Sequence, residues 1–293
     1  MLRAFVCAAA LAVAVEPTAR IHTGSGPCGA VSGFGSVWVA VYETGQVVRI
    51  DVQRNRITKR IRVAKGVCPI ALGGGAVWVA SDQSNVLYRI DPSRARVTKR
   101  IRVARWPAHV TAALGSIWVS GYESGRVTRV DARTGRVMRI YRVGGNPSGI
   151  AAAGGRLWLT FGRGTTIGRL DLAGGTITPY PLGHQAPGFL ERIGGSLWTT
   201  TGDGYALRVD PVTGSVVASV RIPGTPAQPA AAPDGTIWVA EKERDTITRI
   251  DPATNSVLDV SAAGNGALAA VAARGSMWVT SFAGSDVWRY SVK

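Results

Sequence analysis

Short apolar runs rich in β-branched residues alternate with turn-forming residues along most of the chain. Typical runs are Gly-Ser-Val-Trp-Val-Ala at 35–40, Gln-Val-Val-Arg-Ile-Asp at 46–51 and Arg-Ile-Thr-Lys-Arg-Ile-Arg-Val at 56–63. Glycine, aspartate, threonine and asparagine separate these runs, and no stretch has a helical period. The pattern therefore predicts an all-β chain of short strands joined by turns.

A 40-residue period organises these strands into units. A tryptophan preceded by glycine and an apolar residue recurs seven times, at Trp38, Trp78, Trp118, Trp158, Trp198, Trp238 and Trp278. Proline begins four of the units at Pro27, Pro107, Pro147 and Pro187, and the same step falls on Val67, Ala227 and Ala267 in the others. Each unit supplies four strands, which is typical of propellers. We predict a seven-bladed β-propeller of four-stranded antiparallel blades.

The two ends of the chain complement each other in this repeat. The seventh unit stops at Lys293 after its third strand, whereas residues 16–23 align with a fourth strand that has no unit of its own. We therefore expect the N-terminal strand to close the last blade. Residues 15–293 would then form a single propeller domain, which we expect to be a monomer.

The first residues have the features of a secretory signal. Arg3 precedes the apolar stretch 4–15, and Ala12-Val13-Ala14 has the small residues of a cleavage site. This predicts a signal peptide at 1–14 and a secreted, periplasmic or cell-envelope protein. No other apolar run approaches the roughly 18–20 residues of a spanning helix, so we expect no transmembrane segment.

Three sequence pieces recur from unit to unit: Val-Trp-Val-Ala, Gly-x-Val-x-Arg-Ile-Asp-Pro-x-Thr and Pro-x-x-Val-Ala. Through them, residues 16–293 resemble the seven-bladed YVTN/YncE-like propellers and the related virginiamycin B lyase (streptogramin lyase) propellers. The motifs mark the architecture more than an activity, because one propeller fold hosts many functions. We expect a ligand-binding or protein-binding module, with a lyase as the alternative.

The repeated tryptophans and the Arg-x-Asp pairs have structural explanations. Seven identical indoles cannot all face one ligand, so we expect each to pack between neighbouring blades. We expect the arginine and aspartate of each pair, such as Arg49 and Asp51, to form hydrogen-bonding and ionic ties that repeat around the ring. Trp106 and Trp288 fall outside the repeat.

Polar and aromatic residues gather in the loops that follow each tryptophan strand or begin each unit. In a propeller these loops lie on one face, where functional residues are usually found. The predicted ligand-binding residues are Tyr42, Glu43, Trp106, His109, Tyr122, Glu123, Arg163, Asp203, Glu241 and Glu243. The partner would be a small molecule or a protein. Solvated loop tips explain the same residues, and this alternative stays open.

The lyase alternative requires particular residues at particular positions. The resemblance implies a histidine three residues after one tryptophan and Glu-x-His three residues after the next, around a magnesium-assisted elimination. Here Trp198 is followed by Thr201, and Trp238 by Glu241-Lys242-Glu243, so only Glu241 matches. Both histidines that would move protons are missing, and the catalytic residues are unknown. Glu241 and Glu243 are the candidate ligands for a divalent cation, Mg²⁺ or Ca²⁺.

The positive charge of the chain, +16 in total, is concentrated in the first three units. Residues 46–142 hold 20 Lys and Arg against 5 Asp and Glu. Many of these bases fall in the predicted outer strands, as in Lys59-Arg60 and Lys99-Arg100. They either keep exposed strand edges from pairing with other sheets or bind an anionic polymer.

Cys28 and Cys68 lie 40 residues apart and occupy the same position in neighbouring blades. Equivalent positions of adjacent blades approach most closely near the central channel, where the Cα separation suits a disulfide. Two buried thiols explain the same positions, and the sequence leaves both alternatives open.

Overall fold

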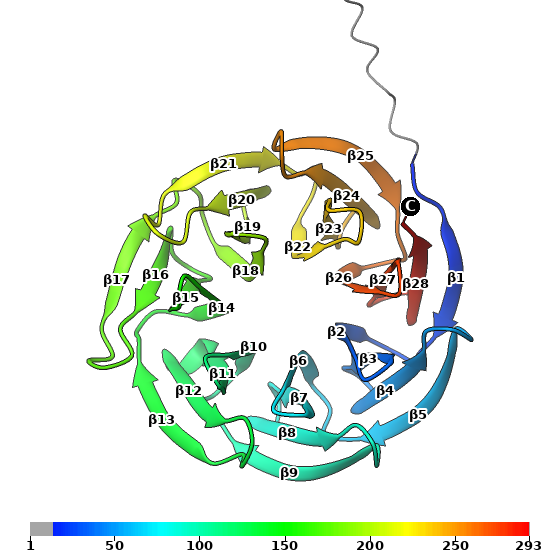
Figure 1. The fold of residues 1–293 in the computed structure, drawn as a ribbon, viewed down its shortest axis with the longest axis horizontal. Helices are drawn as coiled ribbons and strands as arrows, with labels where there is room; N and C mark the ends of the chain where they lie inside the picture. Colours follow the sequence, from blue (N-terminus) through cyan, green and yellow to red (C-terminus); the bar gives the residue numbers. More distant parts are fainter. Residues whose placement is uncertain (1–13, 293) are drawn as a thin grey trace, which may run out of the picture.

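The computed structural model describes residues 14–292, which form a ring of seven four-stranded antiparallel sheets around a central channel (Figure 1). This confirms the predicted seven-bladed propeller. Residues 1–13 of the predicted signal peptide lie outside the described residues. The described part of the chain contains no helix with the length and hydrophobicity needed to cross a membrane.

Each blade runs from an inner strand to an outer strand. The first three blades comprise β2 (Pro27–Gly33), β3 (Ser36–Val41), β4 (Gln46–Asp51), β5 (Arg56–Arg62); β6 (Val67–Gly73), β7 (Ala76–Ser81), β8 (Val86–Asp91), β9 (Arg96–Arg102); and β10 (Pro107–Ala113), β11 (Ser116–Gly121), β12 (Arg126–Asp131), β13 (Val137–Arg142), with the 3-10 turn η1 (Tyr122–Ser124) after β11.

The remaining blades follow the same plan. They comprise β14 (Pro147–Ala153), β15 (Arg156–Phe161), β16 (Thr166–Leu170), β17 (Ile177–Pro181); β18 (Pro187–Ile193), β19 (Ser196–Thr201), β20 (Tyr205–Val209), β21 (Val216–Arg221); β22 (Pro226–Ala231), β23 (Ile237–Glu241), β24 (Thr246–Asp251), β25 (Ser256–Ala262); and β26 (Ala267–Ala273), β27 (Ser276–Ser281), β28 (Asp286–Ser291), β1 (Pro17–His22).

The N-terminal strand closes the seventh blade, as the sequence predicted. β1 pairs antiparallel with β28, with Ile21 opposite Val287. The guanidinium of Arg20 lies 3.8 Å from the ring centroid of Trp288, across the same pair of strands. Both ends of the chain therefore contribute strands to one sheet, so the seventh blade has an outer strand like the other six (Figure 1).

The seven repeated tryptophans form the contacts between blades. Each is at most 1% exposed. Trp38 of the first blade packs with Val77, Val79 and Ile90 of the second, and Trp278 of the seventh packs with the first blade in the same way. The predicted packing between blades is confirmed, and each indole removes a large apolar surface from water.

The Arg-x-Asp pairs work differently from the prediction. The Arg49 guanidinium lies 5.2 Å from the Trp38 ring and donates to the carbonyl of Pro92 in the next blade at 3.3 Å. Asp51 instead accepts the backbone N–H groups of its own turn, from Gln53 and Arg54. The arginine therefore ties blades together, whereas the aspartate caps a turn. The aspartate thus forms its hydrogen bonds within its own turn and not with the arginine two residues before it.

The sixth inner strand departs from the 40-residue step. Pro226 pairs with Glu241 as Pro27 pairs with Val41. Pro226, and not Ala227, therefore begins this blade, and its inner-strand positions fall one residue early. The turn between β22 and β23 is one residue longer than the turn between β2 and β3, because Pro226 precedes Trp238 by 12 residues whereas Pro27 precedes Trp38 by 11. The strict 40-residue step therefore placed Gln228 where Ala227 belongs.

A disulfide joins the inner strands of the first two blades. The Cα atoms of Cys28 and Cys68 are 5.1 Å apart, because equivalent inner positions of adjacent blades meet at the channel. Of the two alternatives that the sequence left open, the structure therefore contains the bridge.

Candidate functional site

The loops after each tryptophan strand and those before each inner strand lie at the same end of the ring, because the four strands of a blade alternate in direction. On this face, which we call the loop face, the first three blades form an open pocket of about 370 Å³. Its walls are Tyr42, Asp82, Gln83, Asn85, Arg105, Trp106 and Glu123. Tyr42, Trp106 and Glu123 were predicted from the sequence, whereas the other four lining residues were not predicted as ligand-binding residues.

Trp106 is the most unusual side chain of this pocket. It is 45% exposed, although it is large and apolar. Its backbone has a φ of 53°, a left-handed conformation that costs energy for a bulky residue. The backbone N–H of Trp106 donates to Asn85 Oδ1 at 2.8 Å, and its backbone carbonyl accepts the backbone N–H of Tyr122 at 2.8 Å. These two bonds hold the indole in an exposed, strained position.

The indole also packs against a second aromatic ring. The ring centroids of Trp106 and Tyr122 are 5.8 Å apart, with the planes tilted by 54°. One face of the indole is therefore supported by protein, and the side chain remains substantially exposed to the pocket. An exposed aromatic surface in a concave pocket is a common feature of ligand sites.

Polar groups converge on the same pocket in two pairs. Tyr42 Oη donates to Asp82 Oδ2 at 3.0 Å, and burial raises the pKa of the Asp82 carboxyl above its usual range. Arg105 Nε donates to Glu123 Oε2 at 2.8 Å. The Arg105 side chain is 70% exposed, so this pair contributes little to stability and leaves donors free to reach a ligand.

The other predicted site residues lie elsewhere. Glu43, Arg163 and Glu243 are exposed, and Asp203 Oδ2 is 2.9 Å from His184 Nδ1 in the fifth blade. None of these four residues lines the pocket of the first three blades. Their role in ligand binding stays a prediction.

Glu241, a predicted metal ligand, lies at the end of β23 and is fully buried. Its Oε1 accepts a hydrogen bond from Thr248, while Oε2 has no hydrogen-bond partner among the described residues. Burial raises the pKa of this carboxyl. Glu243 lies on the surface, so the two carboxylates have different surroundings. Within residues 14–292, no group of three or more His, Cys, Asp or Glu side chains is arranged to hold a metal ion.

A second polar cluster, which was not predicted from the sequence, lies in the central channel. Gln228 Nε2 donates to Glu191 Oε1 at 2.8 Å, and His109 Nε2 lies 3.6 Å from the same oxygen. The N–H of Ile150 donates to His109 Nδ1 at 2.9 Å. The other ring nitrogen therefore carries the proton of the neutral imidazole and points toward Glu191.

Burial acts in opposite directions on the two titratable groups of this channel cluster. It raises the pKa of Glu191 to about 7 and lowers that of His109 to about 4. Both side chains border a cavity of about 300 Å³. That cavity is lined by the later residues of the inner strands, so it lies toward the face opposite the loop face. His109 was predicted as a loop-face residue, but it belongs to the channel.

Many basic residues of the first three blades lie on the rim. β5, β9 and β13 follow one another around the outside of the ring (Figure 1). Arg62, Arg102 and Arg142 occupy equivalent exposed positions on these strands. Other bases are tied to the next blade: Lys99 donates to the Thr134 carbonyl, for example. We call the exposed bases of these three strands the basic rim.

These features define the protein as a seven-bladed propeller with a pocket on its loop face, and comparisons agree on the architecture. A family model described as "Repeat of unknown function (DUF6923)" matches residues 10–148. Virginiamycin B lyase from Staphylococcus aureus is similar, with a TM-score of 0.81 at 20% identity over 94% of this chain and 99% of that chain.

Propellers of other kinds superpose equally well. The WD40 propeller domain of Doa1 has a TM-score of 0.81 at 11% identity, over 95% of this chain and 97% of that chain. A search of curated proteins found no sequence match. At these identities the similarity to solved structures shows the fold alone.

Proposed function

We propose that this protein is a binding module and that its ligand occupies the loop-face pocket of the first three blades. The observation that carries the proposal is Trp106, which is held in an exposed, left-handed conformation against Tyr122. Strained backbone and exposed aromatic surface both cost free energy, and binding sites are where such costs are commonly retained.

The chemistry of the pocket favours a small polar molecule with one apolar face, such as a sugar ring. The indole offers a flat surface for the apolar face. Asp82, Glu123 and Arg105 offer acceptors and donors around it, which suits a ligand with several hydroxyl groups. Water-mediated contacts fit the openness of such a pocket.

The proposal is tested by titrating neutral mono- and disaccharides into the protein and measuring binding heat. The chain offers a matched pair of variants, Trp106→Leu and Phe34→Leu. Phe34 is also 45% exposed and has a φ of 52°, but it lies in the turn between β2 and β3 on the opposite face. We expect Trp106→Leu to weaken binding about tenfold or more and Phe34→Leu to leave it unchanged. The proposal is refuted if Trp106→Leu weakens the binding of none of the saccharides, or if none of them binds.

We also propose that the protein works outside the cytosol, in the cell envelope or as a secreted protein. The disulfide between Cys28 and Cys68 supports this location, because such bridges persist in oxidising compartments. Intact mass after alkylation of the exported protein, without reductant, tests it. Two alkylated thiols at these positions would contradict the proposal.

A second candidate function is a lyase activity on a cyclic peptide, as in the virginiamycin B lyases. The observation in its favour is Glu241, whose buried carboxyl has a raised pKa and one oxygen without a hydrogen-bond partner among the described residues. A carboxyl of this kind suits proton transfer. Incubation of the protein with a streptogramin B in Mg²⁺ buffer, followed by mass and chromatographic detection of the linear product, tests this candidate. No product above that of Glu241→Gln would exclude it.

A further inference from the structure

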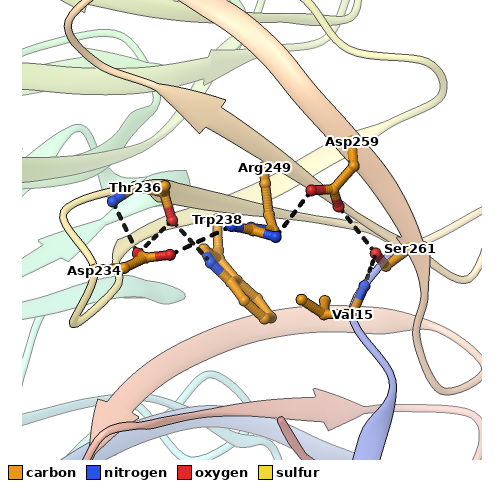
Figure 2. Close-up of polar contacts among 7 residues, drawn as sticks. All are labelled: Val15, Asp234, Thr236, Trp238, Arg249, Asp259 and Ser261. Atoms are coloured by element: carbon orange, nitrogen blue, oxygen red, sulfur yellow. Dashed lines mark hydrogen bonds and ion pairs between the residues drawn. The ribbon is translucent and has the colours of Figure 1, made fainter. Parts of the chain in front are cut away.

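The sixth blade carries a polar network that joins the turn between β22 and β23, together with β24 and β25, to the start of the described chain (Figure 2). Arg249 Nη1 donates to Asp259 Oδ2 at 2.9 Å, and Arg249 Nη2 donates to Asp234 Oδ2 at 3.3 Å. The three side chains are 15%, 6% and 15% exposed, respectively. Two carboxylates and one guanidinium leave this largely buried group with a net charge of −1.

The acidic residue of β25 is peculiar to this blade. The position opposite the repeated arginine is a lysine or arginine in the first three blades, at Lys59, Lys99 and Arg139. In the sixth blade it is Asp259. Burying a negative charge costs free energy unless a positive charge lies nearby. A second cation beside the network would therefore lower this cost.

The backbone nitrogen of Val15 reaches this network. It donates to Ser261 Oγ at 2.8 Å, and Ser261 Oγ donates to Asp259 Oδ1 at 3.0 Å (Figure 2). The Val15 side chain packs on the core between the sixth and seventh blades, whereas Ala14 is exposed. The nitrogen is thus two hydrogen bonds from a carboxylate, at the junction between anchored and exposed chain.

We propose that a leader peptidase cleaves the chain between Ala14 and Val15 and that the new α-ammonium group of Val15 is the missing cation of this network. Hydrolysis adds one water molecule across the peptide bond, which leaves a carboxylate on Ala14 and an ammonium on Val15. Ala12 and Ala14 are the small residues that such peptidases accept. The ammonium keeps the bond to Ser261 and brings the net charge of the group to zero.

The N-terminus of the exported protein gives the first test. The full chain is expressed in a host with a general export pathway, and the product is analysed by intact mass and N-terminal sequencing. The proposal predicts a chain that begins at Val15. A chain that keeps Met1, or that begins at any other residue, would overturn it. This result is independent of whether the loop-face pocket binds a ligand.

The second test isolates the ammonium group. A chain that begins at Val15 is prepared from a cleavable fusion, once with a free amine and once acetylated at the α-nitrogen. We expect acetylation to lower the melting temperature by on the order of 2 °C, because it removes the charge. In Asp259→Asn this difference should disappear. In the control Asp251→Asn, which removes the charge of a turn-capping carboxylate in the same blade, the difference should persist. An equal effect of acetylation in parent and Asp259→Asn would overturn the role of the network.

Discussion

Glu191 provides a prediction whose sign follows directly from the structure. Burial raises the pKa of this carboxyl from 4.5 to about 7. The folded protein therefore holds the proton more tightly than the unfolded chain. Its contribution to stability is fully present at low pH and is lost as the pH rises from about 4.5 through about 7. Glu191→Gln removes the ionisable group while keeping an acceptor for Gln228.

The size of the effect follows from the same interval. The difference between the unfolded and folded pKa values of Glu191 corresponds to at most roughly 3 kcal/mol of unfolding free energy. The Glu191 side chain is 30% exposed to the channel, so we expect about 1–2 kcal/mol after allowance for water in the cavity. His109 acts in the opposite sense: its lowered pKa contributes stability above about 6.5 that is lost as the pH falls toward about 4. Comparison of parent and variant at each pH removes this contribution to a first approximation.

The assay is urea unfolding of parent and Glu191→Gln at pH 4 and pH 8. We expect the two proteins to have similar free energies of unfolding at pH 4, and the variant to be more stable at pH 8. Glu43→Gln, which removes an exposed carboxylate from the loop face, is the control and should change stability by less than about 0.5 kcal/mol at either pH. The reasoning is refuted if the difference between Glu191→Gln and parent is the same at both pH values.

Three further predictions concern the ring and its rim. Reduction of the Cys28–Cys68 bridge should lower the free energy of unfolding by about 4 kcal/mol in the chain-entropy model, given the sequence separation of 40 residues, as measured by urea unfolding with and without reductant. A chain that begins at residue 25 should melt well below one that begins at residue 15, because it lacks β1 and exposes the edge of β28, as calorimetry can measure. Triple substitution of basic-rim arginines by glutamine should lower retention on a polyanion column and reduce its salt dependence; the positions are Arg62, Arg102 and Arg142.

Each of these three predictions has an outcome that would contradict it. Equal stability of reduced and oxidised protein would show that the bridge does not constrain the unfolded chain. Equal melting temperatures of the two chain lengths would contradict closure by β1. For the basic rim, the matched control replaces exposed bases of other blades, Arg192, Lys242 and Arg274. Equal loss of retention in both triple variants would mean that net charge, and not the rim, determines polyanion binding.

The repeat made the fold predictable because each unit repeats its packing residues. Trp38 and its six equivalents are large, buried and evenly spaced, so the number of blades follows from counting them. Closure by β1 followed from the same register. The role of Asp51 was missed because a sequence pair does not reveal whether two side chains point toward each other or toward different neighbours. The shift at Pro226 was missed because the tryptophans keep the 40-residue step, and only strand pairing shows that the turn before Trp238 is one residue longer.

The candidate site was only partly predictable. The register indicated which loops share a face, and so it found Tyr42, Trp106 and Glu123. It did not show how far each loop reaches, so the contributions of Asn85 and Arg105 to the pocket were missed.

The channel cluster was missed for a different reason. Glu191 lies in an inner strand, whereas site residues were predicted only in the loops. A signal was present, because the equivalent inner-strand residues of the other blades are all uncharged: Val31, Ala71, Thr111, Ala151, Ala230 and Val271. A single charged residue among small or apolar equivalents is the pattern that identifies such a site.

The most direct test of the proposed ligand site is the indole N–H spectrum of the ¹⁵N-labelled protein during titration with the saccharide panel. The chain has 9 tryptophans, and the signal that disappears in Trp106→Leu identifies the indole of the pocket. Seven of the others are buried between blades, so a ligand on the loop face should leave them unperturbed. We predict that a bound saccharide shifts the Trp106 signal in a saturable way. Saturable binding that leaves the Trp106 signal in place would contradict the account.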